Sequence, residues 1–415
     1  MNKPEIKPSE NLNNVRYEIR GQLARRAHEL ERQGYEILAL NIGNPGPFGF
    51  RTPETMRLAM IENLAQAEGY CHQKGIFPAR EAVVMQHQAR GVMDVTAEHV
   101  FMGNGVSELI DLTLRALLNR GDEVLIPSPD YPLWTAATTL NGGKAVHYPC
   151  PPGNNFQPDL KALEALITPR TRALVVINPN NPTGAVYSRE CLEALAALAA
   201  QHNLVLLSDE IYDGMVYDSN KSIPMATIAT ETLCATFGGL SKVYRACGYR
   251  VGWVAFSGRL DAANEYLNAL DTLASLRLCS NVPGQWAVQT ALGGYQSIGS
   301  LCQPGGRLFQ SRQAVMDAVA SSRFLSLPTA PQGSMYAFIG VDKRVLPRFD
   351  DQAFALELLE TQHVLIAPGS SFNVPYSNYF RITTLPDETA LAHAFHRIDA
   401  VLESQFSRGV KLETV

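Results

Sequence analysis

Two of the basic side chains in one apolar stretch could do different chemistry: one could form a covalent bond, and the other could bind an anion. The stretch FGGLSKVYRACGYRVGW covers residues 237–253 and contains Lys242 and, eight positions later, Arg250. A cation is costly to bury unless an anion or hydrogen-bond acceptors satisfy it. A lysine can form a Schiff base with an aldehyde, and an arginine can bind a phosphate through two parallel hydrogen bonds. These two residues are therefore candidates for binding one small molecule.

Further polar residues follow other short apolar runs of the chain. They lie in GNGVSE (103–108), Asp130-Tyr131, NPNNPTG (178–184), Asp209 to Tyr212 and Ser241. Taken singly, each is as typical of an ordinary turn or helix cap as of a binding site. GNGVSE does not predict a nicotinamide dinucleotide site, because Glu108 replaces the third glycine of that fingerprint.

A β-α-β unit is clear in the middle of the chain. Residues 172–179 and 203–212 are apolar runs typical of buried strands, and 188–203 between them has apolar residues at helical spacing. This order predicts parallel strands that are covered by helices. Further strands are expected at 99–105, 122–129, 144–150, 234–240 and 250–258, and a helix is expected between Gly105 and Gly121.

The expected fold is α/β, with a mostly parallel central sheet, helices on both of its faces and a smaller α+β domain. Residues 50–310 form the expected large domain and 311–415 the small one, while 1–49 contribute to the small domain and the substrate pocket. The C-terminal part should contain helices at 305–322, 350–362 and 387–405, and strands at 334–340, 363–369 and 379–385. Ligands of open parallel sheets bind beyond the carboxyl ends of the strands, so the polar residues above should meet there.

The composition argues against several classes of function. The 415 residues carry a net charge of −5 without long runs of one sign, so neither nucleic acid nor a membrane surface is an expected partner. No apolar segment reaches the roughly 18 residues of a membrane helix, and the polar N-terminus has no signal-peptide pattern. The seven cysteines are scattered and the histidines form no H-E-x-x-H motif, which predicts a cytoplasmic protein with free thiols and no metal site.

The polar residues together match the requirements of a pyridoxal phosphate (PLP) site. Such a site needs a lysine for the cofactor aldehyde, a carboxylate that keeps the pyridine nitrogen protonated, and donors for the phosphate. The sequence resembles the fold-type I PLP-dependent aminotransferases of class I/II, and within them the bacterial glutamate–pyruvate (alanine) aminotransferases. The motifs that carry this resemblance occur in the order LNIGNPGPFGF, GYCHQKG, GNGVSELI, PSPDYPLW, INPNNPTGAVY, SDEIYD, GLSKVYR, GYRVGW and FRITTLP.

The resemblance implies a role for each residue around the cofactor ring. Lys242 would be the Schiff-base lysine and the base that moves the substrate proton. Asp209 would pair with the pyridine nitrogen, and Tyr131 would stack on the ring face. Tyr212 and Asn181 would hydrogen-bond the phenolic oxygen of the ring.

The resemblance also implies a phosphate site shared between the two subunits of a homodimer. The phosphate would contact Val106, Ser107, Ser241 and Arg250. Tyr70 of the partner subunit would reach the same phosphate, and Ser280 would approach it from that side as well.

For the substrate, the resemblance implies that Arg381 binds the α-carboxylate as a bidentate fork. Asn181 and the backbone of Gly43 would also contact the substrate. Tyr17 and Arg20 match the positions that recognise the substrate side chain in the alanine enzymes. Arg277 is left without a role, because Leu276 occupies the position of the side-chain arginine of the aspartate aminotransferases.

The implied reaction is a ping-pong transfer of an amino group between an L-amino acid and a 2-oxo acid, with alanine plus 2-oxoglutarate giving pyruvate plus glutamate. Three positions near the site, Gly238, Val243 and Gln73, carry Asn, Thr and Ser in most relatives. The alternatives are another substrate pair in a biosynthetic pathway, a C–S β-lyase on the same fold, and a non-catalytic transcription regulator. A regulator would need a DNA-binding module, and none is predicted before residue 40.

Overall fold

The large sheet contains the strands predicted between residues 99 and 258. In the computed structural model, which describes residues 6–13, 15 and 21–413, seven strands lie in the order β2-β8-β7-β6-β5-β3-β4. They are β2 (Val100–Asn104), β3 (Glu123–Ser128), β4 (Lys144–Pro149), β5 (Thr171–Ile177), β6 (Val205–Asp209), β7 (Leu233–Gly239) and β8 (Val251–Gly258). Strands β4, β3, β5, β6 and β7 run parallel, and β8 runs antiparallel to β2 and β7. The predicted α/β fold with a mostly parallel sheet is confirmed.

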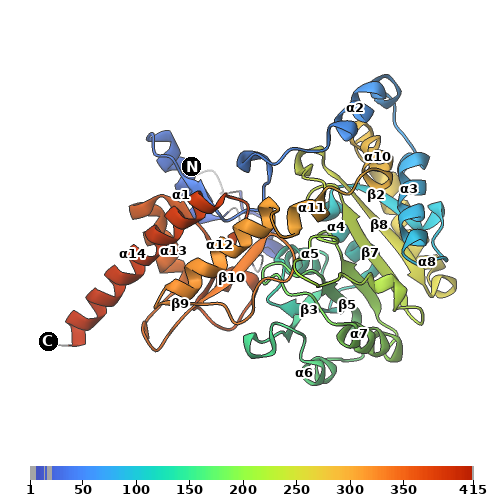
Figure 1. Ribbon diagram of the computed structural model, residues 1–415. Helices are drawn as coiled ribbons and strands as arrows, with labels where there is room; N and C mark the ends of the chain where they lie inside the picture. The colour runs from blue at the N-terminus through green and yellow to red at the C-terminus, as the bar shows by residue number, and fades with distance from the viewer. Residues whose placement is uncertain (1–5, 14, 16–20, 414–415) are drawn as a thin grey trace, which may run out of the picture.

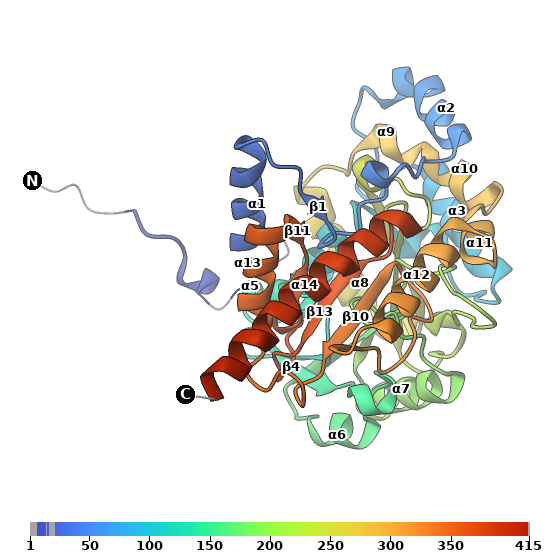
Figure 2. The ribbon, with the colours of Figure 1, turned by 60° about the vertical axis from the view of Figure 1, so that its left-hand side comes forward.

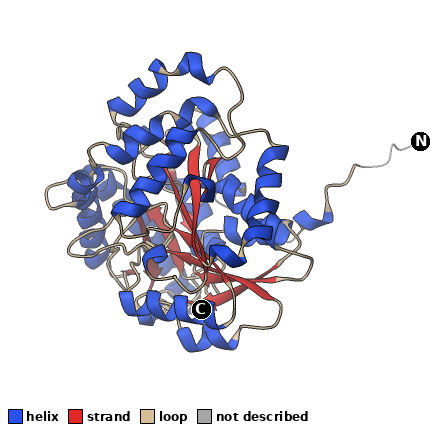
Figure 3. Cartoon of the chain, turned by 90° about the vertical axis from the view of Figure 1, so that its right-hand side faces the viewer, coloured by secondary structure: helices blue, strands red, loops and turns tan. Residues whose placement is uncertain are grey.

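Helices cover both faces of this sheet (Figure 1, Figure 3). The helices of this part of the chain are α2 (Glu54–Glu62), α3 (Phe77–Ala89), α4 (Val106–Leu117), α5 (Leu133–Leu140), α6 (Leu160–Ala165), α7 (Arg189–Gln201), α8 (Asn264–Leu276), α9 (Val282–Gln285), α10 (Ala287–Gly293) and α11 (Ile298–Cys302). In β5, Leu174 and Val176 face one apolar cluster, whereas Val175 and Ile177 face another. Because successive residues of a strand point to opposite faces, a strand buried on both faces is apolar throughout.

A second sheet lies beside the first and has its own core. Its strands are β9 (Leu325–Ser326), β10 (Tyr336–Val341), β12 (Ala367–Pro368) and β13 (Tyr379–Thr383), paired antiparallel in the order β12-β13-β10-β9. The helices of this part are α1 (Gln22–Arg32), α12 (Arg307–Ser321), α13 (Asp351–Gln362) and α14 (Glu388–Glu413), with α14 lying along α12 and α13 (Figure 2). They bury an apolar cluster that includes Ile339 and Phe354 and is separate from the clusters of the large sheet.

The chain between α1 and α2 passes from the small sheet to the large one. Strand β1 (Leu38–Ala39) pairs in parallel with β11 (Val364–Leu365), and the next residue, Leu40, accepts a hydrogen bond from Thr383 N at 2.8 Å. Phe50 then packs in the apolar cluster of the large sheet. This segment therefore crosses the boundary between the two sheets.

Three expected elements differ in the structure. Residues 363–369 form two short strands, β11 and β12, in different sheets; Pro368 lacks an N–H, which suits the edge position of β12. Helix α4 ends at Leu117, four residues before Gly121. Helix α14 continues beyond residue 405 because its only breaker there, Gly409, costs about 1 kcal/mol, too little to end a long helix. Within the described part of the chain, no helix is long and apolar enough to cross a membrane.

Candidate active site

The carboxyl end of β6 places a buried carboxylate at the edge of the large sheet. Asp209 is 3% exposed, and its oxygens accept hydrogen bonds from Trp134 Nε1 at 3.1 Å and from Ile211 N at 3.3 Å. Burial raises the pKa of Asp209 to about 6, although these hydrogen bonds and the nearby charge of Lys242 lower it. Among the described residues, none forms an ion pair with this carboxylate. A cationic group is therefore the ligand that would satisfy it best.

Lys242 lies at the same edge, in the loop after β7. Its Nζ donates a hydrogen bond to Gly43 O at 2.8 Å. Its charge lowers the pKa of both Asp209 and Tyr336, so the ammonium group lies near both side chains. Ser241 precedes it and is buried. The lysine of the apolar stretch thus meets the buried carboxylate at one end of the sheet.

Two buried tyrosines hydrogen-bond each other beside Lys242. The hydroxyl of Tyr212, which follows β6, lies 3.2 Å from the hydroxyl of Tyr336 at the start of β10, and the two rings pack edge to face. Burial raises the pKa of Tyr212 well above its usual range. Burial is the largest influence on the pKa of Tyr336 and raises it, but the charges of Lys242 and Arg381 and the hydrogen bonds with Tyr212 and Gly43 together outweigh burial, so this pKa lies below its usual range. This pair joins the two sheets within the site.

Strand β13 brings a buried arginine to the same place. Arg381 is 1% exposed; its Nη1 donates to Asn181 Oδ1 at 2.8 Å and its Nη2 donates to Asn41 O. The guanidinium carbon lies 4.2 Å from the ring centroid of Tyr336 and 4.7 Å from that of Phe372. These acceptors and rings are neutral, and Nε has no hydrogen-bond partner among the described residues. Among the described residues, the cation is thus held in place without an anion, which suits the binding of a carboxylate.

Gly43 lies where these groups converge. A Cβ atom at this position would lie 2.4 Å from the Tyr336 hydroxyl oxygen and 2.7 Å from Met335 Sδ. Only glycine allows the backbone to approach so closely. The site therefore needs glycine at position 43 for steric reasons.

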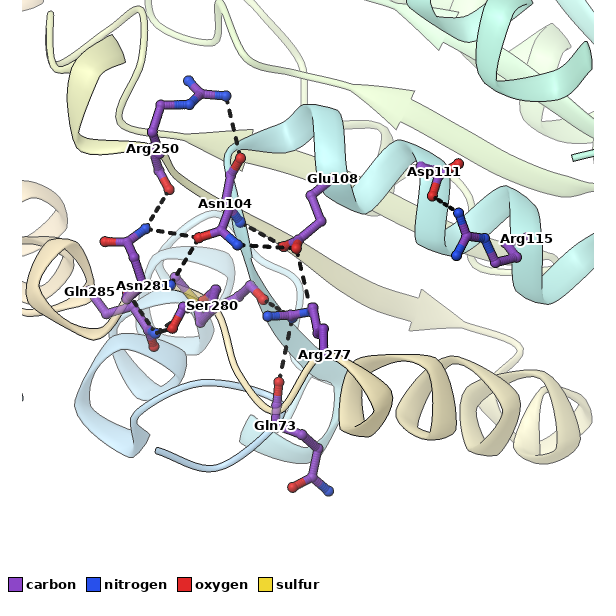
Figure 4. Close-up of polar contacts among 11 residues, drawn as sticks. Gln73, Asn104, Glu108, Asp111, Arg115, Arg250, Arg277, Ser280, Asn281 and Gln285 are labelled. Carbon is purple, nitrogen blue, oxygen red and sulfur yellow. Dashed lines mark hydrogen bonds and ion pairs between the residues drawn. The ribbon is translucent and has the colours of Figure 1, made fainter. Parts of the chain in front are cut away.

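The start of α4 and Arg250 form a second, more exposed part of the site (Figure 4). Gly105 precedes α4 with φ of +80°, and a Cβ atom there would lie 2.5 Å from Arg250 Nη2. Arg250 is exposed, has φ of +52°, and donates from Nη2 to Asn104 O at 3.3 Å. The first N–H groups of a helix have no partner within the helix and favour anions. Val106 and Ser107 occupy these first positions of α4.

A chain of polar contacts runs behind this part of the site, from Arg250 to Arg277 (Figure 4). Asn281 Nδ2 donates to Arg250 O at 2.8 Å, and Asn281 N donates to Asn104 Oδ1 at 2.9 Å. Asn104 N donates to Glu108 Oε2 at 2.7 Å, and Arg277 Nε lies 3.7 Å from Glu108 Oε1. These contacts connect the helix α4, the end of α8 and the start of β8.

The structure gathers most of the predicted site residues and leaves others apart. Contacts join Lys242 to Gly43 and Arg381 to Asn181, and Tyr131 lies near enough to affect the pKa of Tyr212. Ser280 is buried and accepts a hydrogen bond from Gln285 Nε2 at 3.0 Å. Tyr70 is 82% exposed in the loop before α3. Tyr17 and Arg20 lie outside the described residues.

Trp134 and Tyr336 belong to the site although the sequence motifs did not assign them. A buried tryptophan N–H needs an acceptor, which is a signal that could have linked Trp134 to a strand-end carboxylate. No comparable signal exists for Tyr336, because its partner Tyr212 is 124 positions away and belongs to the other sheet.

Comparison with known proteins identifies the family. The model of the family "Aminotransferase class I and II" matches residues 35–398. The chain belongs to this family. The resemblance inferred from the motifs is therefore confirmed over most of the sequence.

Individual aminotransferases match over nearly the whole chain. The glutamate-pyruvate aminotransferase AlaA of Escherichia coli is 49% identical over 381 residues, which cover 92% of this chain and 94% of the relative. An alanine aminotransferase of Mycobacterium tuberculosis is 48% identical over 401 residues, which cover 95% and 92%. A crystal structure of an aminotransferase from Escherichia coli superposes with a TM-score of 0.94 at 46% identity and covers 96% of this chain and 99% of that one.

The aminotransferase site fits PLP, on which this fold-type I family depends. Asp209 is a buried carboxylate without an ion-pair partner among the described residues, and a protonated pyridine nitrogen would supply the missing cation. Lys242 is a primary amine within the same site. The start of α4 and the exposed Arg250 offer donors for a phosphate. The chemistry of the donor set therefore agrees with the cofactor of the family.

Proposed function

We propose that this aminotransferase exchanges an amino group between alanine and 2-oxoglutarate, giving pyruvate and glutamate, by a ping-pong mechanism that runs in either direction. The proposal is supported by relatives of 48–49% identity that are named as glutamate-pyruvate and alanine aminotransferases. The structural observation that carries it is Arg381, a buried cation with neutral described partners next to Lys242 and Asp209. A carboxylate held there would lie beside the amine that does the chemistry.

In this proposal, five residues hold and tune the cofactor ring. PLP supplies an electron sink for the negative charge that develops when the substrate Cα–H bond breaks. Asp209 keeps a proton on the pyridine nitrogen, which makes the ring a better electron acceptor. Tyr212 and Asn181 hydrogen-bond the phenolic oxygen, and Tyr131 covers a face of the ring. Lys242 would bind the cofactor aldehyde, and its amine would carry the proton from the substrate Cα.

The phosphate is bound by the more exposed part of the site. The residues that we assign to it are Val106, Ser107, Ser241 and Arg250. In the proposed homodimer, Tyr70 of the partner subunit adds a hydroxyl, whereas Ser280 is buried in its own chain and is not assigned to the phosphate. The high exposure of Tyr70 in the single chain is consistent with this role.

Substrate recognition uses the groups around Gly43. Arg381 binds the α-carboxylate as a bidentate fork, helped by Asn181 and by the backbone of Gly43. We assign Tyr17 and Arg20 to the substrate side chain. Replacing Arg20 should then impair glutamate and 2-oxoglutarate more than alanine and pyruvate, whereas an equal loss for both pairs would exclude this assignment.

The proposal includes the arrangement of the whole protein. Residues 50–310 form the large domain, 311–415 form the small domain, and 1–49 serve the small domain and the substrate pocket. The reaction takes place in the cytoplasm, where the seven free cysteines would stay reduced.

A panel of amino donors and 2-oxo acid acceptors tests the proposed substrates. Purified protein is loaded with PLP, and kcat/KM is measured for alanine, aspartate, tyrosine and cystathionine with 2-oxoglutarate, and for glutamate with pyruvate or oxaloacetate. Alanine with 2-oxoglutarate, and glutamate with pyruvate, should give the highest values.

Two results would contradict the assignment in different ways. Poor use of pyruvate alongside good use of another 2-oxo acid would leave an aminotransferase with a different substrate pair. Release of pyruvate and ammonia from cystathionine without any 2-oxo acid would instead indicate a C–S β-lyase.

A further inference from the structure

Arg277 has no task in the proposed reaction, although its side chain is only 15% exposed. It follows α8, and its Nη2 donates to Met102 O at 2.7 Å. Its Nε lies 3.7 Å from Glu108 Oε1, and no described residue accepts a hydrogen bond from Nε or Nη1. The guanidinium thus faces β2 and α4 of its own chain (Figure 4). An arginine held in this way is placed to support neighbouring structure rather than to bind a substrate.

Glu108 links Arg277 to the turn that starts α4. Its Oε2 accepts from Asn104 N at 2.7 Å and its Oε1 from Asn104 Nδ2 at 3.1 Å. Asn104 is followed by Gly105, whose φ of +80° sets the direction in which α4 begins. Fixing Asn104 therefore fixes where the first N–H groups of α4 point. A carboxylate in the first helical turn is also favoured by the helix dipole.

Asn104 extends the same constraint to Arg250. Asn104 O accepts from Arg250 Nη2 at 3.3 Å. Asn104 Oδ1 accepts from Asn281 N at 2.9 Å, and Asn281 Nδ2 donates in turn to Arg250 O at 2.8 Å. The guanidinium of Arg250 is thus tied to Asn104 directly, and its backbone is tied to Asn104 through Asn281 (Figure 4). The helix start and the arginine are held as one unit.

We propose that Arg277 and Glu108 are positioning residues for the cofactor phosphate. Through Asn104 they hold the start of α4 and Arg250 in the arrangement that binds it. Arg277 also neutralises Glu108, whose negative charge would otherwise weaken the attraction of this region for a phosphate. The inference rests on the proposed function, because it takes the start of α4 and Arg250 as the phosphate site.

The test compares PLP with pyridoxal, which has the same ring and aldehyde but no phosphate. Dissociation constants of both are measured by absorbance titration of the cofactor-free protein, for the wild type and for Glu108→Gln, Arg277→Met and the double variant. Arg277→Met should raise the dissociation constant of PLP about tenfold or more and change that of pyridoxal by no more than about twofold. The reason is that this variant leaves the Glu108 carboxylate unpaired beside the phosphate site. Glu108→Gln should weaken PLP less, and the double variant should recover part of the loss caused by Arg277→Met, because the two residues are coupled.

Helix α4 provides a matched control in the Arg115–Asp111 pair, one turn further along (Figure 4). Arg115→Met removes the same kind of side chain from a 2.6 Å ion pair and should leave the ratio of the two dissociation constants unchanged. Inorganic phosphate, tested as a competitor of PLP, should bind more weakly to Arg277→Met and normally to Arg115→Met.

The outcomes separate this inference from the proposed function. A wild-type protein that binds no PLP would end the proposed function, and this inference with it. A wild type that binds PLP, with equal losses of PLP and pyridoxal or no loss in the variants, would overturn the positioning role alone. If circular dichroism shows that Arg277→Met does not fold, the ratio measured for Glu108→Gln decides the matter in the same way.

Discussion

The inner and outer parts of the site differ in how exposed their polar groups are. Asp209, Tyr212 and Arg381 are each at most 3% exposed and are bound by hydrogen bonds from their own chain. Arg250 is exposed, and Tyr70 is 82% exposed. Buried polar groups that bond within their own chain are positioned when the chain folds, so folding largely sets the inner geometry. The outer groups are also held by their own chain, as Arg250 is by Asn104, but their exposure leaves them open to a ligand. Changes there should therefore affect cofactor affinity more than chemistry.

The most severe test of the inner part is Lys242→Ala. In the proposed function the amine of Lys242 forms the covalent link to the cofactor and moves the Cα proton, and this variant could do neither. We expect kcat to fall by about 10,000-fold or more, as for the loss of other essential catalytic groups. The exposed Lys144→Ala, which only breaks a pair with Glu123, serves as a control and should retain full activity. Activity of Lys242→Ala above a few per cent of the wild type would argue against its role.

Conservative changes of two arginines compare the two parts directly. Arg381→Lys keeps the charge but loses the bidentate fork, and should lower kcat/KM for amino acids about 100-fold. Arg250→Lys should instead weaken the binding of PLP about tenfold and leave KM for amino acids unchanged once PLP is saturating. The experiment measures both parameters for both variants. Similar profiles for the two would show that the inner and outer parts are not functionally distinct.

The pH dependence of the cofactor-free protein tests the electrostatics of the inner part. The folded-state pKa of Asp209 is raised to about 6, so the folded state holds this proton more tightly than the unfolded state does. The stability that the proton provides is therefore complete below about pH 4 and is lost as the pH rises through 6. The free energy of unfolding of Asp209→Asn should match that of the wild type near pH 4 and exceed it by up to about 3 kcal/mol near pH 7.

Urea unfolding across this pH range measures the effect, and Glu210→Gln is the control. Burial, with some help from Asp213, raises the pKa of Glu210 to about 7. The stability that its proton provides is therefore lost over a higher pH range, between about pH 4.5 and 7. The free energies of unfolding of the wild type and of Asp209→Asn would then diverge between pH 4 and 6. A constant difference between them over this range would contradict the raised pKa of Asp209.

The smallest expected effect concerns the link between the two sheets. Tyr336→Phe removes the hydroxyl that contacts Tyr212 but keeps the ring against Arg381, so kcat should fall about threefold to tenfold with little change in KM for amino acids. Tyr148→Phe removes another buried hydroxyl, which donates to Val175 O at 2.8 Å, away from these groups. That control should lose stability without a specific change in kcat. A change in KM alone for Tyr336→Phe would indicate that the hydroxyl serves substrate binding.

The strands, most helices and the family could be predicted from the sequence because their signals are local. An apolar run such as 172–179 and a motif such as NPNNPTG lie within a few residues. The antiparallel direction of β8 could not be predicted, because strand direction depends on pairing with β2 and β7. The split of 363–369 into two strands likewise depends on β1 and β13, which come from distant parts of the chain.

The same distinction between local signals and long-range contacts applies to the site. Lys242 and Asp209 follow recognisable strands, whereas the contact between Tyr336 and Tyr212 exists only because two sheets meet. Arg277 shows the opposite case. An arginine in a sequence can have several roles. Only the contacts of Arg277 with Met102 O and Glu108 distinguish a supporting arginine from a substrate-binding one.

The charge of Arg381, which no described residue neutralises, has a practical consequence for anyone who assays this enzyme. A buried guanidinium whose described acceptors are Asn181 Oδ1 and Asn41 O will exchange a neutral acceptor for any small carboxylate that can reach it. Acetate, formate and citrate from buffers would therefore act as competitive inhibitors, and apparent KM values would rise with their concentration. Kinetic constants measured without small carboxylates would be free of this competition.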